Sequence, residues 1–135
     1  MSVGPPVVAV INSSNELVEL LKVSLEQAGL LVVTLLSHQI KDGGVDIDAY
    51  MRQHNPRVIV YDLAPPYASD WALLEHIRSF ESLKHCRFVL TSPNVAHVRG
   101  MVGRDEQVYE IIGKPHDIGE FVGAVLQAVK ARPTS

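Results

Sequence analysis

The stretch Arg57-Val58-Ile59-Val60-Tyr61-Asp62-Leu63-Ala64-Pro65-Pro66 decides the fold. Its four apolar or aromatic residues from 58 to 61, three of them β-branched, predict a strand buried on both faces, as in the middle of a parallel sheet. Because burying an ionised carboxylate without a partner is costly, Asp62 at the end of this run indicates a functional position. Pro65 and Pro66 then force a loop, since proline cannot extend a central strand. We therefore expect Asp62 at the carboxyl end of a central strand, where open α/β sheets place their binding sites.

The composition favours one soluble globular domain. The chain has 135 residues, of which 47% are hydrophobic and 20% are charged, and its net charge of −3 argues against nucleic-acid binding. The one cysteine, Cys86, excludes an internal disulfide and fits a reducing compartment. No apolar run is long enough for a membrane span, and the first residues lack the features of a signal peptide. We expect a cytoplasmic, single-domain protein that covers residues 1–135, with a core of about 6–131.

Five short apolar runs alternate with segments of helical spacing. The predicted strands are 7–11, 31–36, 58–61, 88–90 and 108–112, and the predicted helices are 16–28, 46–54, a segment from Ser69 or Asp70 to Phe80, 94–103 and 117–131. Ser14 or Asn15 is expected to cap the first helix and Gly29 to end it, and Ser69 or Asp70 is expected to cap the third, whereas 41–44 indicates a loop. The alternation predicts a doubly wound α/β fold of the flavodoxin-like type. Its five parallel strands should lie in the order 2-1-3-4-5, with helices on both faces.

Polar side chains follow four of these strands. Asn12 and Ser13 come after the first, Asp62 after the third, Thr91 after the fourth and Lys114 after the fifth. Because the carboxyl ends of parallel strands meet at one edge, we expect these side chains to converge. A carboxylate, a hydroxyl and an ammonium group together suit the handling of a small anion on Asp62. The competing interpretation is a plain salt bridge between Asp62 and Lys114, but three residues on separate strands favour a site.

Three motifs stand out together: Val58-Ile59-Val60-Tyr61-Asp62 with Pro66 four residues after the aspartate, Val89-Leu90-Thr91-Ser92, and Lys114-Pro115. On these motifs, the sequence between about residues 7 and 131 resembles the receiver domains of two-component response regulators. The resemblance implies that Asp62 is the phosphoacceptor, Thr91 the switch hydroxyl and Lys114 the charge clamp.

The sequence departs from this family at the metal-binding pair. Family members carry two acidic residues after the first strand, which hold Mg²⁺ with the phosphoacceptor, and here those positions are Asn12 and Ser13. Binding of Mg²⁺ to a protein depends on the negative charge of carboxylate ligands. Phosphoryl transfer in turn needs the metal to offset charge on the transferring oxygens. We therefore expect no resident metal or cofactor beyond weak Mg²⁺ affinity at Asp62, Asn12 and the Ala64 backbone, and weak or absent phosphorylation.

The switch aromatic of the family is also missing. The family usually has Tyr or Phe three residues before the clamp lysine, where this chain has Ile111, and Tyr109 lies two residues earlier on the same face of the predicted strand. With Asn12 and Ser13, this departure resembles the pseudo-receivers, which act in signal transduction through fixed protein contacts and are not enzymes.

The expected partners are proteins: a histidine kinase, another receiver or a separate output protein, with no direct contact to nucleic acid or membrane. In this family the fourth helix, fifth strand and fifth helix commonly carry such contacts, and pairing of two copies through them is a candidate. Arg99, Arg104, Asp105 and Glu106 give this surface a mixed charge suited to specificity. The competing interpretation is an ordinary solvated face.

Two alternatives remain open. One is a working phosphoacceptor receiver, phosphorylated on Asp62 by a histidine kinase. The other is a small flavodoxin-like ligand-binding or enzymatic domain, which the absence of phosphate-binding glycine motifs disfavours. The six histidines have no metal-binding spacing, and Cys86 is expected to be buried without acting as a nucleophile.

Overall fold

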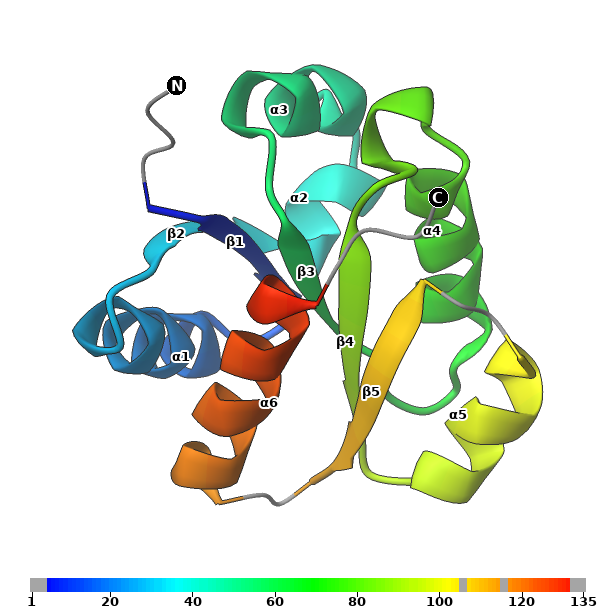
Figure 1. The fold of residues 1–135 in the computed structure, drawn as a ribbon. Helices are drawn as coiled ribbons and strands as arrows, with labels where there is room; N and C mark the ends of the chain where they lie inside the picture. The colour runs from blue at the N-terminus through cyan, green and yellow to red at the C-terminus, as the bar shows by residue number, and fades with distance from the viewer. Residues whose placement is uncertain (1–4, 105–106, 115–116, 132–135) are drawn as a thin grey trace.

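The computed structural model describes residues 5–104, 107–114 and 117–131. Five strands form one parallel sheet in the order β2-β1-β3-β4-β5, which confirms the predicted order (Figure 1). The strands are β1 (Val7–Asn12), β2 (Leu31–Leu36), β3 (Val58–Asp62), β4 (Arg87–Ser92) and β5 (Val108–Gly113). The helices are α1 (Asn15–Gln27), α2 (Ser37–Lys41), α3 (Ile47–His54), α4 (Ala68–Arg78), α5 (Val95–Val102) and α6 (Ile118–Lys130), with a 3₁₀ turn η1 (Glu81–Leu83).

The central strand β3 is buried along its whole length, as its sequence predicts. Its side chains alternate between two hydrophobic clusters. Val58 and Val60 face one cluster, and Ile59 and Tyr61 face the other. This two-sided burial explains why the strand carries a continuous apolar run instead of an alternating pattern.

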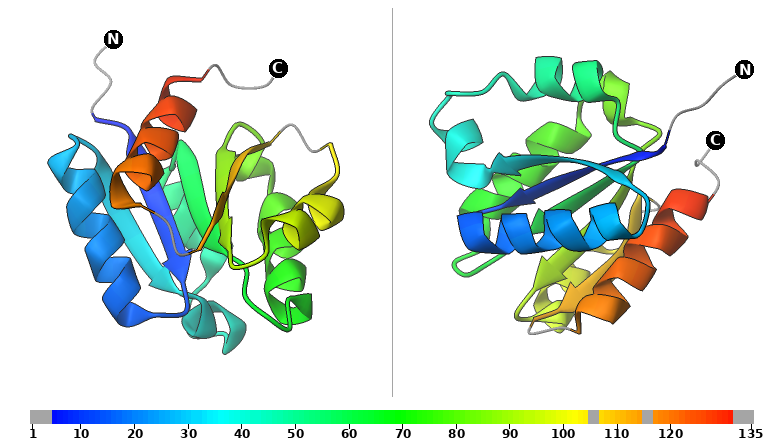
Figure 2. Two further views of the ribbon diagram at one scale, coloured as in Figure 1. Left: turned by 90° about the horizontal axis from the view of Figure 1, so that it is seen from below. Right: turned by 90° about the vertical axis from the view of Figure 1, so that its left-hand side faces the viewer.

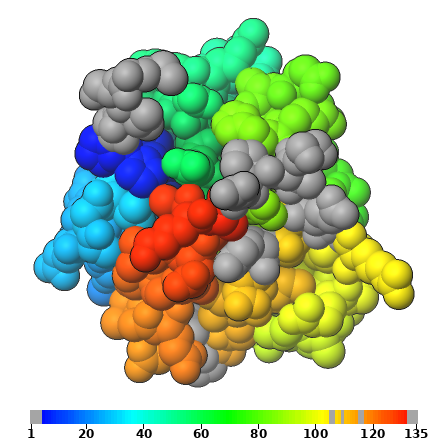
Figure 3. Space-filling view, in the orientation of Figure 1, coloured from blue at the N-terminus to red at the C-terminus, as the bar shows by residue number. Residues whose placement is uncertain are grey.

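Helices cover both faces of the sheet (Figure 2). Helices α1 and α6 pack over the cluster that contains Val60, whereas α2, α3, α4 and α5 pack over the cluster that contains Tyr61. In the space-filling view, α6 lies across the middle of the first face with α1 beside it (Figure 3). This is the predicted arrangement of two helical layers with a parallel sheet between them.

The ends of α1 agree with the signals in the sequence. The Ser14 hydroxyl accepts a hydrogen bond from the Leu17 amide at 3.2 Å and so caps the helix. Gly29 follows the last cap residue with a φ of +95°, a conformation that glycine adopts without a steric penalty.

Two helix starts differ from the sequence-based expectation. Helix α2 was not predicted because five residues are too few to show a helical period, and it begins where the Gln39 side chain accepts from the Leu36 amide at 3.2 Å. Helix α4 begins at Ala68, so neither Ser69 nor Asp70 is its cap residue. The cap position is Tyr67, with a φ of +69° and no side-chain hydrogen bond to the helix, and the Asp70 carboxylate instead accepts from the Ala64 amide in the preceding loop.

The last helix also differs in one detail. The predicted apolar stripe of α6 begins with Ile118, but this side chain is exposed while Phe121 and Val125 are buried. Ile118 is the first residue of the helix and therefore precedes the part that packs on the sheet. Within the part of the chain that the structure describes, no helix has the length and apolar character needed to cross a membrane.

The packing of α1 gives a matched test of the fold. Leu21 is 1% exposed and its neighbour Leu20 is 55% exposed on the same helix. We expect Leu21→Ala to lower the free energy of unfolding by about 2–5 kcal/mol, because it leaves a cavity in the core, and Leu20→Ala to change it by less than about 0.5 kcal/mol. Urea denaturation of both variants measures the difference, and equal losses would contradict the placement of α1.

Candidate functional site

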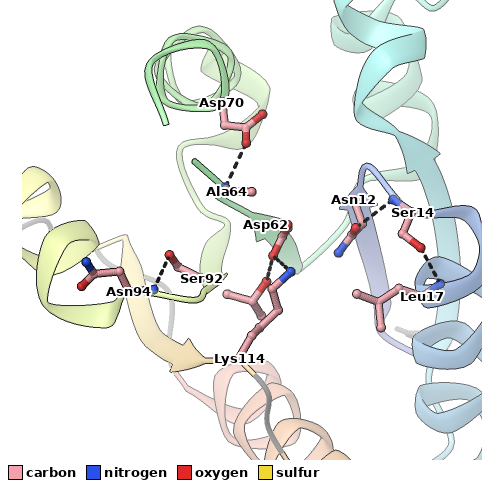
Figure 4. A network of polar contacts seen from close by, with 10 residues as sticks. Asn12, Ser14, Leu17, Asp62, Ala64, Asp70, Ser92, Asn94 and Lys114 are labelled. Atoms are coloured by element: carbon pink, nitrogen blue, oxygen red, sulfur yellow. Dashed lines mark hydrogen bonds and ion pairs between the residues drawn. The ribbon is translucent and has the colours of Figure 1, made fainter. Parts of the chain in front are cut away.

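Asp62, Thr91 and Lys114 meet at the carboxyl edge of the sheet (Figure 4). The Thr91 hydroxyl donates a hydrogen bond to Asp62 Oδ1 at 2.6 Å, and Lys114 Nζ lies 2.8 Å from the same oxygen. The Asp62 side chain is only 4% exposed. The structure therefore brings together the carboxylate, the hydroxyl and the ammonium group that the sequence predicted at this edge.

The register of the sheet explains why these side chains converge. Asp62 and Thr91 are paired positions of β3 and β4, and the Lys114 amide extends the next pairing by donating to the Ser92 carbonyl at 2.9 Å. Asp62, Thr91 and Lys114 each come two residues after a residue that packs in or against the hydrophobic cluster under α1 and α6. These three cluster residues are Val60, Val89 and Ile112, in the same order. Because side chains alternate along a strand, all three positions belong to one face of the sheet.

The electrostatics of this cluster are close to neutral. One buried carboxylate faces one ammonium group, and a hydroxyl supplies a second donor to the same oxygen. Charge-assisted hydrogen bonds of this kind stabilise an ionised carboxylate in a position that water reaches poorly. The arrangement can hold Asp62 as an anion without a metal ion.

The two positions after β1 behave differently from each other. Asn12 is buried at the same edge, and its side-chain oxygen accepts a hydrogen bond from the Ser14 amide at 3.0 Å. Ser13 is exposed. In Figure 4, Lys114 points toward Asp62, whereas the contact drawn from Asn12 runs to Ser14 and leads into α1.

The residues present do not fit a magnesium site of the kind the receiver resemblance implies. Three of the oxygens expected to bind the ion weakly accept hydrogen bonds within the protein: Asp62 Oδ1 from Thr91, Asn12 Oδ1 from Ser14, and the Ala64 carbonyl from the Tyr67 amide at 2.9 Å. Asp62 is the one carboxylate among these donors, and its charge is already balanced by Lys114. In the ranges described above, no three His, Cys, Asp or Glu side chains are grouped closely enough to hold a metal ion. Mg²⁺ needs more anionic oxygen than this donor set offers.

Sequence reasoning missed the residues that hold the loop after Asp62. Asp70 Oδ2 accepts a hydrogen bond from the Ala64 amide at 3.0 Å, and Asp70 Oδ1 lies 2.7 Å from Lys41 Nζ. The sequence places Asp70 near the start of a helix, which predicts a helix cap and not a contact with the loop before it. Lys41 gave no signal, because its helix α2 was not predicted.

The structure places the other predicted residues as follows. Ile111 is buried in the cluster covered by α2 to α5, and Arg99 and Arg104 are exposed.

The pairing of β5 with β4 shifts by one residue along the strand, since Val108 pairs with Phe88 whereas Glu110 pairs with Val89. Asp105, Glu106, Pro115 and His116 lie outside the described residues.

Two aromatic residues that follow Asp62, Tyr67 in the loop and Trp71 in α4, pack against neighbouring elements. The ring of Tyr67 lies 4.5 Å from that of His97 on α5, measured between ring centroids. Trp71 is partly buried and packs against the cluster under α4. Both observations agree with packing roles for these two residues.

A groove lies on the side of the sheet that α2, α3 and α4 cover. The groove has a volume of about 510 Å³ and runs between the α2–α3 connection and α4. It is lined by Ile40, Lys41, Val45, Asp46, Ile47, Ser69, Ala72, Leu73 and His76. The lining contains neither Asp62 nor its two partners, so this groove is distinct from the strand-edge site.

Cys86 is buried, which confirms one sequence-based expectation. Its Sγ donates to the Pro56 carbonyl at 2.9 Å, and burial raises the pKa of the thiol to about 12. We expect iodoacetamide at about pH 8.5 to modify the folded protein far more slowly than the urea-unfolded chain, since the thiolate is depleted by roughly a thousandfold and the thiol is shielded. Mass spectrometry over time measures both rates, and equal rates would contradict the burial of Cys86.

The pairing of Asp62 with Lys114 can be tested by stability measurements. Lys114→Met leaves the Asp62 carboxylate buried without its cation, and we expect a loss of about 1–3 kcal/mol in the free energy of unfolding. Combining it with Asp62→Asn removes the uncompensated charge and should recover part of that loss. Lys84→Met, at an exposed lysine, is the control. Additive losses in the double variant would contradict the pairing.

Comparisons with known proteins give results at the level of structure. No family model matches the sequence, and a search of curated proteins finds no match. Among solved structures, a CheY-like response regulator receiver domain from Methylobacillus flagellatus is 22% identical, with a TM-score of 0.70 over 94% of this chain and 100% of that chain. A response regulator from Thermotoga maritima is 16% identical, with a TM-score of 0.72 over 94% of this chain and 99% of that chain.

A third similar structure comes from a protein with an enzymatic name. It is a response regulator receiver modulated diguanylate cyclase from Pelobacter carbinolicus, 15% identical, with a TM-score of 0.68 over 93% of this chain and 92% of that chain. The three structures share the five-stranded parallel architecture with this chain at low sequence identity. The fold of this chain is therefore that of the response-regulator receiver domains.

Proposed function

We propose that this chain is an atypical receiver domain that acts in signal transduction through protein contacts, with weak or absent Mg²⁺-dependent phosphorylation of Asp62. The observation that carries the proposal is the carboxylate-poor surrounding of Asp62: Lys114 and Thr91 already bind its Oδ1, and Asn12 and Ser13 add no carboxylate. The receiver fold supports signalling as the general role. On this account the domain is not an enzyme.

The chemistry of phosphoryl transfer supports weak phosphorylation. The attacking carboxylate oxygen must approach a highly charged phosphoryl group, and a divalent cation normally offsets that charge. Here the ammonium group of Lys114 is the only cation that contacts Asp62 among the described residues. One positive charge balances the carboxylate itself and leaves no surplus for the incoming phosphoryl oxygens.

The partners we propose are proteins: a histidine kinase, another receiver or a separate output protein. The fourth and fifth helices of the expected receiver pattern correspond to α5 and α6, because α2 and α3 together take the place of one helix. Arg99 and Arg104 are exposed at this surface and available for charged contacts. Asp105 and Glu106, which complete the predicted mixed-charge surface, remain part of the proposal on sequence grounds alone.

A working phosphoacceptor is the second candidate function. It is favoured by the convergence of Asp62, Thr91 and Lys114, the residue types that the receiver resemblance assigns to phosphoacceptor, switch and clamp. The flavodoxin-like ligand-binding alternative has less support, because the groove beside α4 does not include these residues.

Incubation with acetyl phosphate and excess Mg²⁺, followed by intact-mass measurement, separates the two candidates. We expect little or no adduct on the wild-type protein and none on Asp62→Asn. Replacing Asn12 and Ser13 by Asp together restores two carboxylates at the metal positions and should produce a Mg²⁺-dependent adduct. Near-full occupancy on the wild-type chain would overturn the proposal in favour of the working phosphoacceptor.

A binding measurement follows once a partner has been identified. Asp62→Asn should leave the affinity for that partner within a fewfold of wild type, since the contacts do not depend on phosphorylation. The variant is measured beside the wild-type chain in the presence of Mg²⁺ and acetyl phosphate. A partner whose affinity for the wild type responds to acetyl phosphate, and for the variant does not, would support the conventional switch.

A further inference from the structure

The loop between β3 and α4, residues 63–67, is bound by a side chain of the following helix, that of Asp70. Asp70 Oδ2 accepts from the Ala64 amide at 3.0 Å, and the Asp70 backbone carbonyl accepts from the Tyr61 hydroxyl at 2.6 Å. Burial raises the pKa of Tyr61, with the Asp70 and Asp62 carboxylates adding to the effect, so this hydroxyl stays a donor. The start of α4 is therefore fixed to the end of β3 on both sides of Asp62.

The other oxygen of the same carboxylate reaches a distant segment. Asp70 Oδ1 lies 2.7 Å from Nζ of Lys41, the last residue of α2. The two side chains are 33% and 17% exposed, so this ion pair is less screened than one at the open surface. Asp70 thus joins α2, through Lys41, to the backbone amide two residues after Asp62.

The other contacts of the loop are backbone hydrogen bonds, such as that from the Leu63 amide to the Thr91 carbonyl at 2.9 Å, and the ring contact of Tyr67 with His97. Tyr67 adopts a φ of +69°, which is unfavourable for a residue with a Cβ, and it provides no side-chain cap for α4. The carboxylate of Asp70 lies in the first turn of α4, where a negative charge is favourable. Removing the charge of the Asp70 carboxylate, or changing the orientation of that side chain, therefore loosens a loop whose backbone is already strained.

We propose that Lys41 and Asp70 are positioning residues that couple α2 to the Asp62 loop, so that the Lys41–Asp70 ion pair sets the conformation that partners meet beside Asp62. The functional meaning of this coupling rests on the proposed role as a receiver that works through fixed contacts. The coupling itself is a property of the isolated protein, independent of Mg²⁺, phosphorylation and any partner. A group that binds at α2 and competes for Lys41 would act on the Asp62 loop through this ion pair.

Amide hydrogen exchange measured by NMR on the free protein tests the coupling. We expect Asp70→Asn to speed exchange of the Ala64 amide by roughly tenfold, because its charged acceptor is lost. Lys41→Met should speed it by roughly threefold and shift the amide resonances of Leu63 and Tyr67, because Asp70 loses the partner that orients it. Lys41→Arg, which keeps the charge, should restore wild-type behaviour at these amides.

The matched control is Arg52→Met. Arg52 forms a 3.0 Å ion pair with Asp48 within α3, so the variant removes a surface ion pair without touching the loop. Exchange at Ala64 is compared with that of the β3 amide of Val60, which reports global unfolding. A Lys41→Met variant that behaves like Arg52→Met, or that speeds Ala64 and Val60 equally, would overturn the proposal. Neither result bears on whether Asp62 accepts a phosphoryl group, so the two proposals fail separately.

Discussion

The ionised carboxylate of Asp62, buried at the end of a central strand, is the constraint on which the site depends. A charge in that position must be compensated, and the protein does this with the Lys114 ammonium group and the Thr91 hydroxyl on a single oxygen. Both partners reach Asp62 because the parallel register of β3, β4 and β5 aligns their ends on one face. Side chains of the protein itself provide this compensation, and the proposed weak binding of Mg²⁺ follows from it.

The same logic extends to the loop beyond Asp62. A second carboxylate, Asp70, satisfies one loop amide and one lysine, so two anions at neighbouring positions are each balanced within the protein. Asn12 occupies the position where a third negative charge would enter and instead accepts a hydrogen bond from the start of α1. These contacts are the structural basis of the proposal that the domain works through a fixed conformation.

Much of the fold and of the site around Asp62 could be predicted from the sequence, because the sequence patterns that indicate them are local and strong. The apolar run before Asp62, the helical spacing of α1 and α6 and the glycine after α1 each reflect one physical cause that acts within a few residues. The convergence of Asp62, Thr91 and Lys114 then follows from parallel topology alone. Helix α2, the cap position at Tyr67 and the Lys41–Asp70 pair could not be predicted, since a five-residue helix has no period and a contact across 29 residues depends on packing. The register shift in β5 likewise arises from pairing with β4.

The most direct test of the central claim is a crystal structure of the protein grown in excess Mg²⁺. The account predicts that Lys114 Nζ stays within hydrogen-bonding distance of Asp62 Oδ1, that Thr91 still donates to the same oxygen, and that no metal ion is coordinated by Asp62. An octahedral ion bound between the ends of β1 and β3, with Asp62 and the side chain of Asn12 or Ser13 among its ligands, would contradict it.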